Sequence, residues 1–232
     1  MRLIFFIFTI SFFSFTKHVP EKYDVIFEND YQSAKQFIIN HFTNFKQASA
    51  KYNHHYLFAT AIIFPELMRY SYLKDILEST ALELVYVEYG SSVADFSIGH
   101  FQMKPSFIES LETEISKSDS LSYLYSNLLM NKQLTEKQKR RIRLERLNNV
   151  EWQINYLHAF IAVCDELFKD IEFKSLSEKL IIYSTAYNSG FYQSMTQLKI
   201  KSGNKHFPFG PKYQGTQYAY SDIAKYYFIY SH

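Results

Sequence analysis

Residues 54–70 read HHYLFATAIIFPELMRY, a stretch that is almost wholly apolar from position 56 onward. We interpret it as a helix that packs inside the protein. Pro65 lies within the run, and because proline lacks a backbone N–H it should kink the helix or restart it at this point. Such a kink could direct the neighbouring Glu66 into a cleft.

Glu66 occupies the position in this stretch where a carboxyl group is least expected. Burial disfavours the charged form and raises the pKa of a carboxylic acid, by several units when burial is complete. A glutamate that stays protonated near neutral pH can serve as a general acid. The alternative is a solvated helix face on which Glu66 pairs with Arg69, three residues further along.

The segments on either side of this stretch carry helical signals, either apolar residues at helical spacing or capping residues. We expect helices over 33–50, 73–89, 99–111, from Thr135 towards Asp165, over 175–190 and over 221–230. Residues 201–217 hold three of the six glycines and two of the five prolines and are predicted to form a loop. So few glycines and prolines are unfavourable for a strand-rich sandwich or barrel. The 232 residues therefore predict one all-α domain.

Composition excludes several other classes of protein. A chain that is 47% hydrophobic and 19% aromatic will not stay disordered. Cys164 is the single cysteine, so no disulfide forms within the chain. The net charge of +2 gives no general reason to expect nucleic acid as a partner.

The N-terminus resembles an export signal. Residues 1–17 contain one arginine, then an apolar run from Leu3 to Phe15, then a polar exit. The run is short for a membrane span, which needs about 20 apolar residues. No small-x-small cleavage pattern precedes Lys17, so an uncleaved anchor is the alternative to a signal peptide. Either way, we expect an exported protein of the periplasm or cell envelope.

Two further segments carry polar groups in places suited to binding. In the segment ADFSIGHFQMKPS, residues 94–106, a glycine allows close backbone approach, and Gln102 supplies both a donor and an acceptor. In the segment YSTAYNSG, residues 183–190, a helix should end with Tyr187 and Asn188 at its rim. An aromatic ring can stack on a sugar and the amide can bond its hydroxyls. Structural alternatives are a loop-to-helix junction and an ordinary helix C-cap.

Read in order, three segments resemble the soluble lytic transglycosylase family, the goose-type lysozyme-like enzymes that cleave peptidoglycan. They are AIIFPE at 61–66, GHFQMKP at 99–105 and AYNSG at 186–190, the counterparts of the family's catalytic-Glu helix, Gly-Leu-Met-Gln segment and Ala-Tyr-Asn-Ala-Gly segment. The resemblance implies a lysozyme-like helical domain over 56–232 with inserted helices, preceded by an N-terminal helical extension over 18–55. The chain departs from the family in having Leu67, where most members have serine. It also has two long inserts, one between Glu66 and Gly99 that contains the helix expected over 73–89, and one between the second and third segments that contains the charged run 137–146.

The resemblance also implies a site and a reaction. Glu66 would protonate the glycosidic oxygen between N-acetylmuramic acid and N-acetylglucosamine, and would then act as the base that closes a 1,6-anhydro ring. That makes the protein a lyase with one catalytic carboxyl group and no cofactor or metal. Peptidoglycan glycan strands are the implied partner, and the implied substrate-binding residues are Ser97, Gln102, Met103, Tyr187, Asn188 and a tyrosine of the final segment, Tyr220 or Tyr218.

Two other functions stay open from the sequence. In a hydrolytic lysozyme, Asp95 or Glu83 would position a water molecule. In a catalytically silent envelope scaffold, the inserts would bind glycan or a partner protein. Oligomeric state is undetermined.

A basic run, KQKRRIRLER at 137–146, could suggest a nucleic-acid site. We interpret it instead as a solvated helix face with an apolar seam of Ile142, Leu147 and Val150. In the envelope it would also suit attraction to anionic wall polymer or to lipid head groups in a peripheral membrane association.

Overall fold

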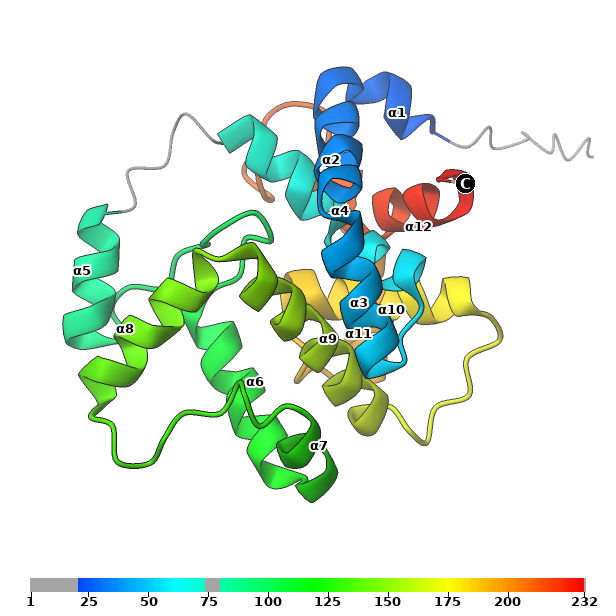
Figure 1. The fold of residues 1–232 in the computed structure, drawn as a ribbon. Coiled ribbons are helices and arrows are strands. Elements are labelled where there is room, and N and C mark those ends of the chain that lie inside the picture. Colours follow the sequence, from blue (N-terminus) through cyan, green and yellow to red (C-terminus); the bar gives the residue numbers. More distant parts are fainter. Residues whose placement is uncertain (1–20, 74–79, 232) are drawn as a thin grey trace, which may run out of the picture.

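The protein is all-α apart from one two-stranded sheet, as a computed structural model that describes residues 21–73 and 80–231 shows (Figure 1). The proposed export segment over 1–17 and part of the helix expected over 73–89 lie outside the described residues. The elements are α1 (Tyr23–Ile26), α2 (Glu28–Asn40), α3 (Phe42–Tyr52), α4 (Tyr56–Leu73), α5 (Thr80–Tyr89), α6 (Pro105–Lys117), α7 (Asp119–Leu124), α8 (Glu136–Leu147), α9 (Val150–Leu167), α10 (Leu176–Ser189), α11 (Met195–Ser202), β1 (Lys205–Phe207), β2 (Tyr218–Ala219) and α12 (Tyr220–Tyr230).

Helix α4, which contains the apolar stretch around Glu66, is the centre of the fold. It packs against α2, α3, α9, α10 and α12, which surround it in Figure 1. Ala59, Ile62, Ile63 and Phe64 are fully buried on different sides of the helix. The helices of the N-terminal extension take part in the same core, to which α2 and α3 contribute Ile38 and Phe45 among others.

The helix is continuous through Pro65, so the expected restart is wrong. Proline inside a helix removes one backbone hydrogen bond and costs about 3 kcal/mol. Apolar packing on several sides of α4 outweighs that loss, because each fully buried Ile or Phe side chain contributes about 1.5–3 kcal/mol. Glu66 is therefore aimed by the regular phase of the helix rather than by a break in it.

Several other helix boundaries differ from the sequence expectations. The helix expected over 33–50 is two helices, which meet at His41. The long charged helix also divides, because the Asn149 side chain accepts hydrogen bonds from the first turn of α9 and so starts a new helix. The segment expected to be a loop over 201–217 includes the end of α11 and strand β1, which pairs with β2. Helix α12 begins at Tyr220 without a side-chain cap, one residue before the expected start at Ser221.

Local signals in the sequence account for three helix ends. Thr135 and Gln138 form a complete capping box at the start of α8. Pro105 occupies the first turn of α6, so the helix expected over 99–111 begins there and not at Gly99. Gly190 ends α10 with φ 98°, a conformation that glycine adopts without strain.

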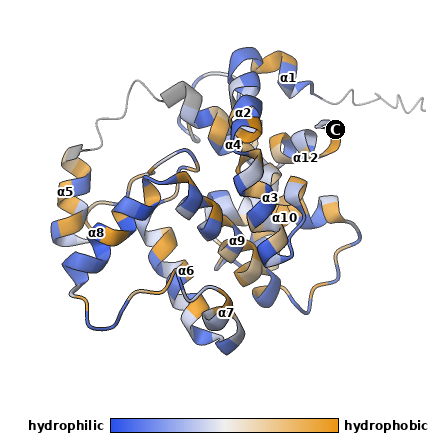
Figure 2. Cartoon of the chain, in the orientation of Figure 1, coloured by the Kyte–Doolittle hydropathy of each residue, from blue (hydrophilic) through white to orange (hydrophobic). Residues whose placement is uncertain are grey.

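The basic run on α8 is only partly a solvated face. Figure 2 shows α8 as mostly hydrophilic, yet Arg140 donates from Nε to the Val87 carbonyl oxygen (2.9 Å) and from Nη2 to the Glu88 carbonyl oxygen (3.0 Å). Arg143 is buried and pairs with Glu112. Arg146 likewise donates to the Leu128 and Asn127 carbonyl oxygens. Three arginines of the run thus fasten α8 to neighbouring segments, a use of charge that the sequence interpretation missed. Among the described residues, none of the helices is both long and apolar enough to cross a membrane.

Candidate active site

Glu66 lies at a cavity of about 370 Å³ that the three sequence segments build together. The side chain is 4% exposed, and the cavity is also lined by Gln102, Tyr187 and Asn188. Helix α4 supplies the carboxyl group, the loop before α6 supplies the glutamine, and the end of α10 supplies the last two residues. Segments separated by more than 100 residues therefore meet at one carboxyl group.

The electrostatics of Glu66 combine both expectations drawn from the sequence. Burial raises its pKa above the ordinary value, while the Arg69 charge and the Tyr220 hydroxyl oppose that rise. Arg69 donates from Nη1 to both carboxylate oxygens of Glu66, at 3.1 and 3.0 Å. The i, i+3 pair therefore exists, but it is buried at a cavity and not on a solvated face.

The loop that carries Gln102 is a tight turn which only glycine permits at its start. Gly99 has φ 69°, and a Cβ atom there would lie 1.9 Å from Nε2 of Gln153 and 2.5 Å from the Leu147 carbonyl oxygen. Gln102 has φ 50° and donates from Nε2 to the Gly99 carbonyl oxygen at 2.8 Å. Gln153, fully buried on α9, accepts the Phe101 N–H at 2.9 Å. The sequence indicated the close approach at Gly99 but gave no sign of Gln153, its partner 54 residues further on.

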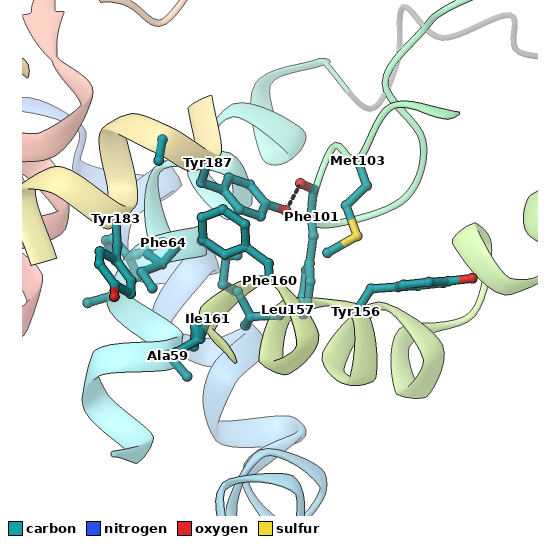
Figure 3. Close-up of a cluster of buried hydrophobic side chains, with 14 of the residues drawn as sticks. Ala59, Phe64, Phe101, Met103, Tyr156, Leu157, Phe160, Ile161, Tyr183 and Tyr187 are labelled. Carbon is teal, nitrogen blue, oxygen red and sulfur yellow. Dashed lines mark hydrogen bonds between the residues drawn. The ribbon is translucent and has the colours of Figure 1, made fainter. Parts of the chain in front are cut away.

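Tyr187 anchors this loop and has little free surface for a sugar. Its ring is 8% exposed, and its hydroxyl donates to the Phe101 carbonyl oxygen at 2.8 Å, the dashed line in Figure 3. Phe107 and Phe160 pack against the ring in T-shaped contacts at centroid distances of 5.4 and 5.3 Å. The expected stacking platform is thus mainly a strut that holds the Gln102 loop against α10.

The remaining predicted residues differ in how they relate to the cavity. Ser97 and Met103 line it, with Met103 almost fully buried, and the exposed Asn188 lies at its rim. Tyr220 lines a second cavity, which adjoins the first, and its hydroxyl donates a hydrogen bond to the Ile62 carbonyl oxygen at 3.0 Å. Tyr218, the other candidate from the final segment, does not line the cavity, and its ring packs against Tyr23 and Phe27 instead.

Tyr192 is the exposed aromatic residue of the cavity, and the sequence interpretation missed it. Its side chain is 56% exposed, lines the cavity and is held by a hydrogen bond from its hydroxyl to the Ser110 carbonyl oxygen at 2.9 Å. The residue lies two positions after Gly190, where a chain leaving a helix end next to the site could have drawn attention to it. It has the open face that Tyr187 lacks.

Of the two carboxyl groups considered for water activation, only Asp95 lines the cavity. Both of its oxygens accept hydrogen bonds from Ser106, one from the backbone N–H (3.0 Å) and one from the hydroxyl (2.7 Å). Glu83 lies on α5, accepts a hydrogen bond from Asn148 and is not among the lining residues. The described residues contain no group of three or more His, Cys, Asp or Glu side chains that could hold a metal ion.

Comparison with protein-family models, curated proteins and solved structures finds no match to this chain. The class that fold and site define is an all-α protein with one buried carboxyl group, paired to an arginine, at a cavity with polar amide groups around it.

Proposed function

We propose that the protein is a peptidoglycan lytic transglycosylase that uses Glu66 as its single catalytic carboxyl group. The observation that carries the proposal is the convergence of the segments around Glu66, Gln102 and Asn188 on one cavity. These segments are the ones whose residues resemble that enzyme family. A lysozyme-like helical arrangement with inserted helices belongs to the same proposal.

The reaction needs one group that first gives and then takes a proton. Glu66 protonates the glycosidic oxygen as the bond from that oxygen to C1 of N-acetylmuramic acid breaks, which releases the 4-hydroxyl of N-acetylglucosamine. The carboxylate then accepts the proton of the muramoyl 6-hydroxyl, whose oxygen forms the new bond to C1. No water is consumed, and Glu66 ends protonated as it began. Burial supports the first step, because it raises the pKa of Glu66 and favours the protonated acid.

The groups around Glu66 suit a sugar with acetamido substituents. Gln102 and Asn188 carry amides at the cavity, Ser97 carries a hydroxyl, and Met103 supplies an apolar wall. Tyr192 offers the aromatic face on which a sugar ring could lie. Ligand sites in proteins commonly combine an apolar wall with a few polar groups in this way.

Hydrolysis is the second candidate because Asp95 lines the same cavity. A water-activating carboxylate needs an oxygen directed at the water, as in the two-carboxylate glycosidases. Both Asp95 oxygens already accept hydrogen bonds from Ser106, which favours a structural role at the start of α6. We therefore prefer transglycosylation. Export to the periplasm or cell envelope, where peptidoglycan is found, is part of the proposal and rests on the sequence of residues 1–17.

Mass spectrometry of purified sacculi digested with the protein tests the proposal. We expect 1,6-anhydro-muropeptides, and the Glu66→Gln variant should lose about 10²- to 10⁴-fold in rate, the usual range for a general acid. Asp95→Asn should keep the anhydro products, and Glu83→Gln is the matched control outside the cavity. Reducing ends in place of anhydro ends would establish hydrolysis. Sacculi that cosediment with the protein but stay intact would establish a scaffold.

A further inference from the structure

A second cavity, of about 810 Å³, adjoins the Glu66 cavity. The two share Arg69, Lys104, Asn188 and Ser189 as lining residues. Its far side is formed by the end of α11, by Phe207 at the end of β1 and by the chain from Pro208 to Pro211 that follows. When a polymer is bound at Glu66, the second cavity would therefore lie next to the bond that is cleaved.

The second cavity is basic in a protein that is nearly neutral overall. Arg69, Lys104 and Lys201 line it together with His206, and its lining in the described part of the chain includes no aspartate or glutamate. The whole chain carries a net charge of only +2. Charges of one sign around a concave surface reinforce one another and attract a ligand of the opposite sign. The cavity is therefore suited to an anionic group.

Arg69 lies at the junction of the two cavities and lines both of them. Its Nη1 is bound to Glu66, and its guanidinium carbon lies 5.2 Å from the centroid of the Phe207 ring. Its Nε is buried and has no hydrogen-bond partner among the described residues. Because that Nε is enclosed by protein, what Arg69 offers an anion in the second cavity is the charge of its guanidinium group.

We propose that the second cavity binds carboxylate groups of the peptide stem that peptidoglycan carries on its muramoyl lactyl group. The inference rests on the proposed function, because it places N-acetylmuramic acid beside Glu66. The stem branches from that sugar and carries several carboxylates. Its attachment point would therefore lie next to the bond that is cleaved. A cavity of 810 Å³ has room for part of such a peptide. The substrate class is then stem-bearing glycan, in preference to glycan stripped of its stems.

Calorimetric titration of the full-length Glu66→Gln protein tests this inference, with binding read out in place of cleavage. The probes are short glycan fragments with their stems and the same fragments after an amidase has removed the stems. We expect the stem to improve affinity at least about tenfold, equivalent to about 1.4 kcal/mol. A Lys201→Ala/His206→Ala change in the same protein should abolish this stem-dependent gain. Both side chains are exposed, and circular dichroism checks that the helices are retained.

A Lys199→Ala/Lys212→Ala protein is the matched control, since it removes two exposed lysines that line neither cavity. Its stem-dependent gain should equal that of the parent protein. Equal affinity for stemmed and stripped glycan in the parent protein would overturn the inference. So would inorganic phosphate that displaces the stem at comparable concentration, because the site would then be a general anion site suited to a phosphate-bearing polymer.

Cleavage of stripped glycan by the wild-type protein, followed in parallel, separates this inference from the proposed function. Anhydro products from stripped glycan without any preference for stems would contradict only the stem site. A wild-type protein that cleaves neither form would contradict the proposed function itself.

Discussion

Two buried glutamates, Glu66 and Glu112, each pair with an arginine, but in contrasting surroundings. Glu112, on α6, is 7% exposed, and its partner Arg143, on α8, is 8% exposed. Glu66 is 4% exposed, while the side chain of its partner Arg69 is 21% exposed and lies on the same helix. One pair joins two helices, and the other joins two turns of one helix.

The hydrogen bonds show what each pair does. Glu112 accepts from Arg143 Nε at 2.8 Å and from the Tyr156 hydroxyl at 3.0 Å, and Arg143 also reaches Glu109 at 3.5 Å. This network fastens α6, α8 and α9 together. The ion pair of Glu66 with Arg69 lies within α4 and borders two cavities instead. A buried charged group whose hydrogen bonds all go to residues inside the fold has a structural role, whereas one beside a cavity is available to a ligand.

The largest expected effect on stability comes from the structural pair. Glu112→Gln leaves the buried Arg143 charge without its main partner, which should lower the free energy of unfolding by about 3–5 kcal/mol. Urea unfolding followed by circular dichroism measures the loss. Glu145→Gln, at an exposed position on the same helix as Arg143, is the control and should change little. A loss for Glu112→Gln as small as that of the control would contradict the structural role.

His158 extends the comparison to a buried group that lines neither of these two cavities. Its ring is fully buried next to His54, with an Nδ1–Nδ1 distance of 2.9 Å, and burial lowers its pKa from 6.5 to about 3. Below pH 6.5 the unfolded chain binds a proton on this histidine, whereas the folded protein does not bind it until the pH approaches 3. The contribution of His158 to stability is therefore fully present above pH 6.5 and is lost as the pH falls towards 3. The slope is about 1.4 kcal/mol per pH unit, or roughly 2 kcal/mol at pH 5.

Urea unfolding at pH 7.5 and pH 5.0 checks this, because His158→Gln should reduce the difference between the two values. His206→Gln, at an exposed histidine, should leave the difference unchanged. An unaltered pH dependence in His158→Gln would show that another group is responsible.

Arg69→Met addresses the pair at the cavity and should alter activity more than folding. The Arg69 charge lowers the pKa of Glu66, so its removal should raise that pKa further. A general acid is active while protonated, so the alkaline limb of kcat/KM on stripped glycan should move to higher pH. Arg141→Met removes an exposed charge on α8 and is the control. An alkaline limb that stays in place, or moves to lower pH, would separate Arg69 from the titration of Glu66.

The smallest expected effect on stability is that of Glu66→Gln. The amide carries no charge, so the variant avoids the desolvation that a buried carboxylate suffers, and Arg69 keeps partial contact with solvent. Thermal unfolding should give an unchanged or slightly higher Tm. The free energy of unfolding should change by no more than about 1 kcal/mol, as is common when a charge at a functional site is removed. A loss like that of Glu112→Gln would mean that Glu66 is structural too.

Much of the fold was predictable because its signals are local. The capping box of Thr135 and Gln138 and the glycine end of α10 depend on neighbours within a few residues. Continuity of α4 through Pro65 was not predictable, since it depends on the helices packed around it. The division of the long charged helix at Asn149 shows the opposite case, a local cap that the sequence interpretation overlooked.

The sequence by itself determined the all-α class and singled out Glu66, because an ionisable residue in an apolar helix stands out in a linear pattern. Only the tertiary structure decided what surrounds it. The hydrogen bonds from the Phe101 N–H to Gln153 and from the Tyr187 hydroxyl to the Phe101 carbonyl oxygen join residues 52 and 86 positions apart. The pairing of Glu112 with Arg143 spans 31 positions. A charge pattern does not reveal whether an arginine such as Arg143 faces water or a buried carboxylate, because burial is set by the packing of distant helices.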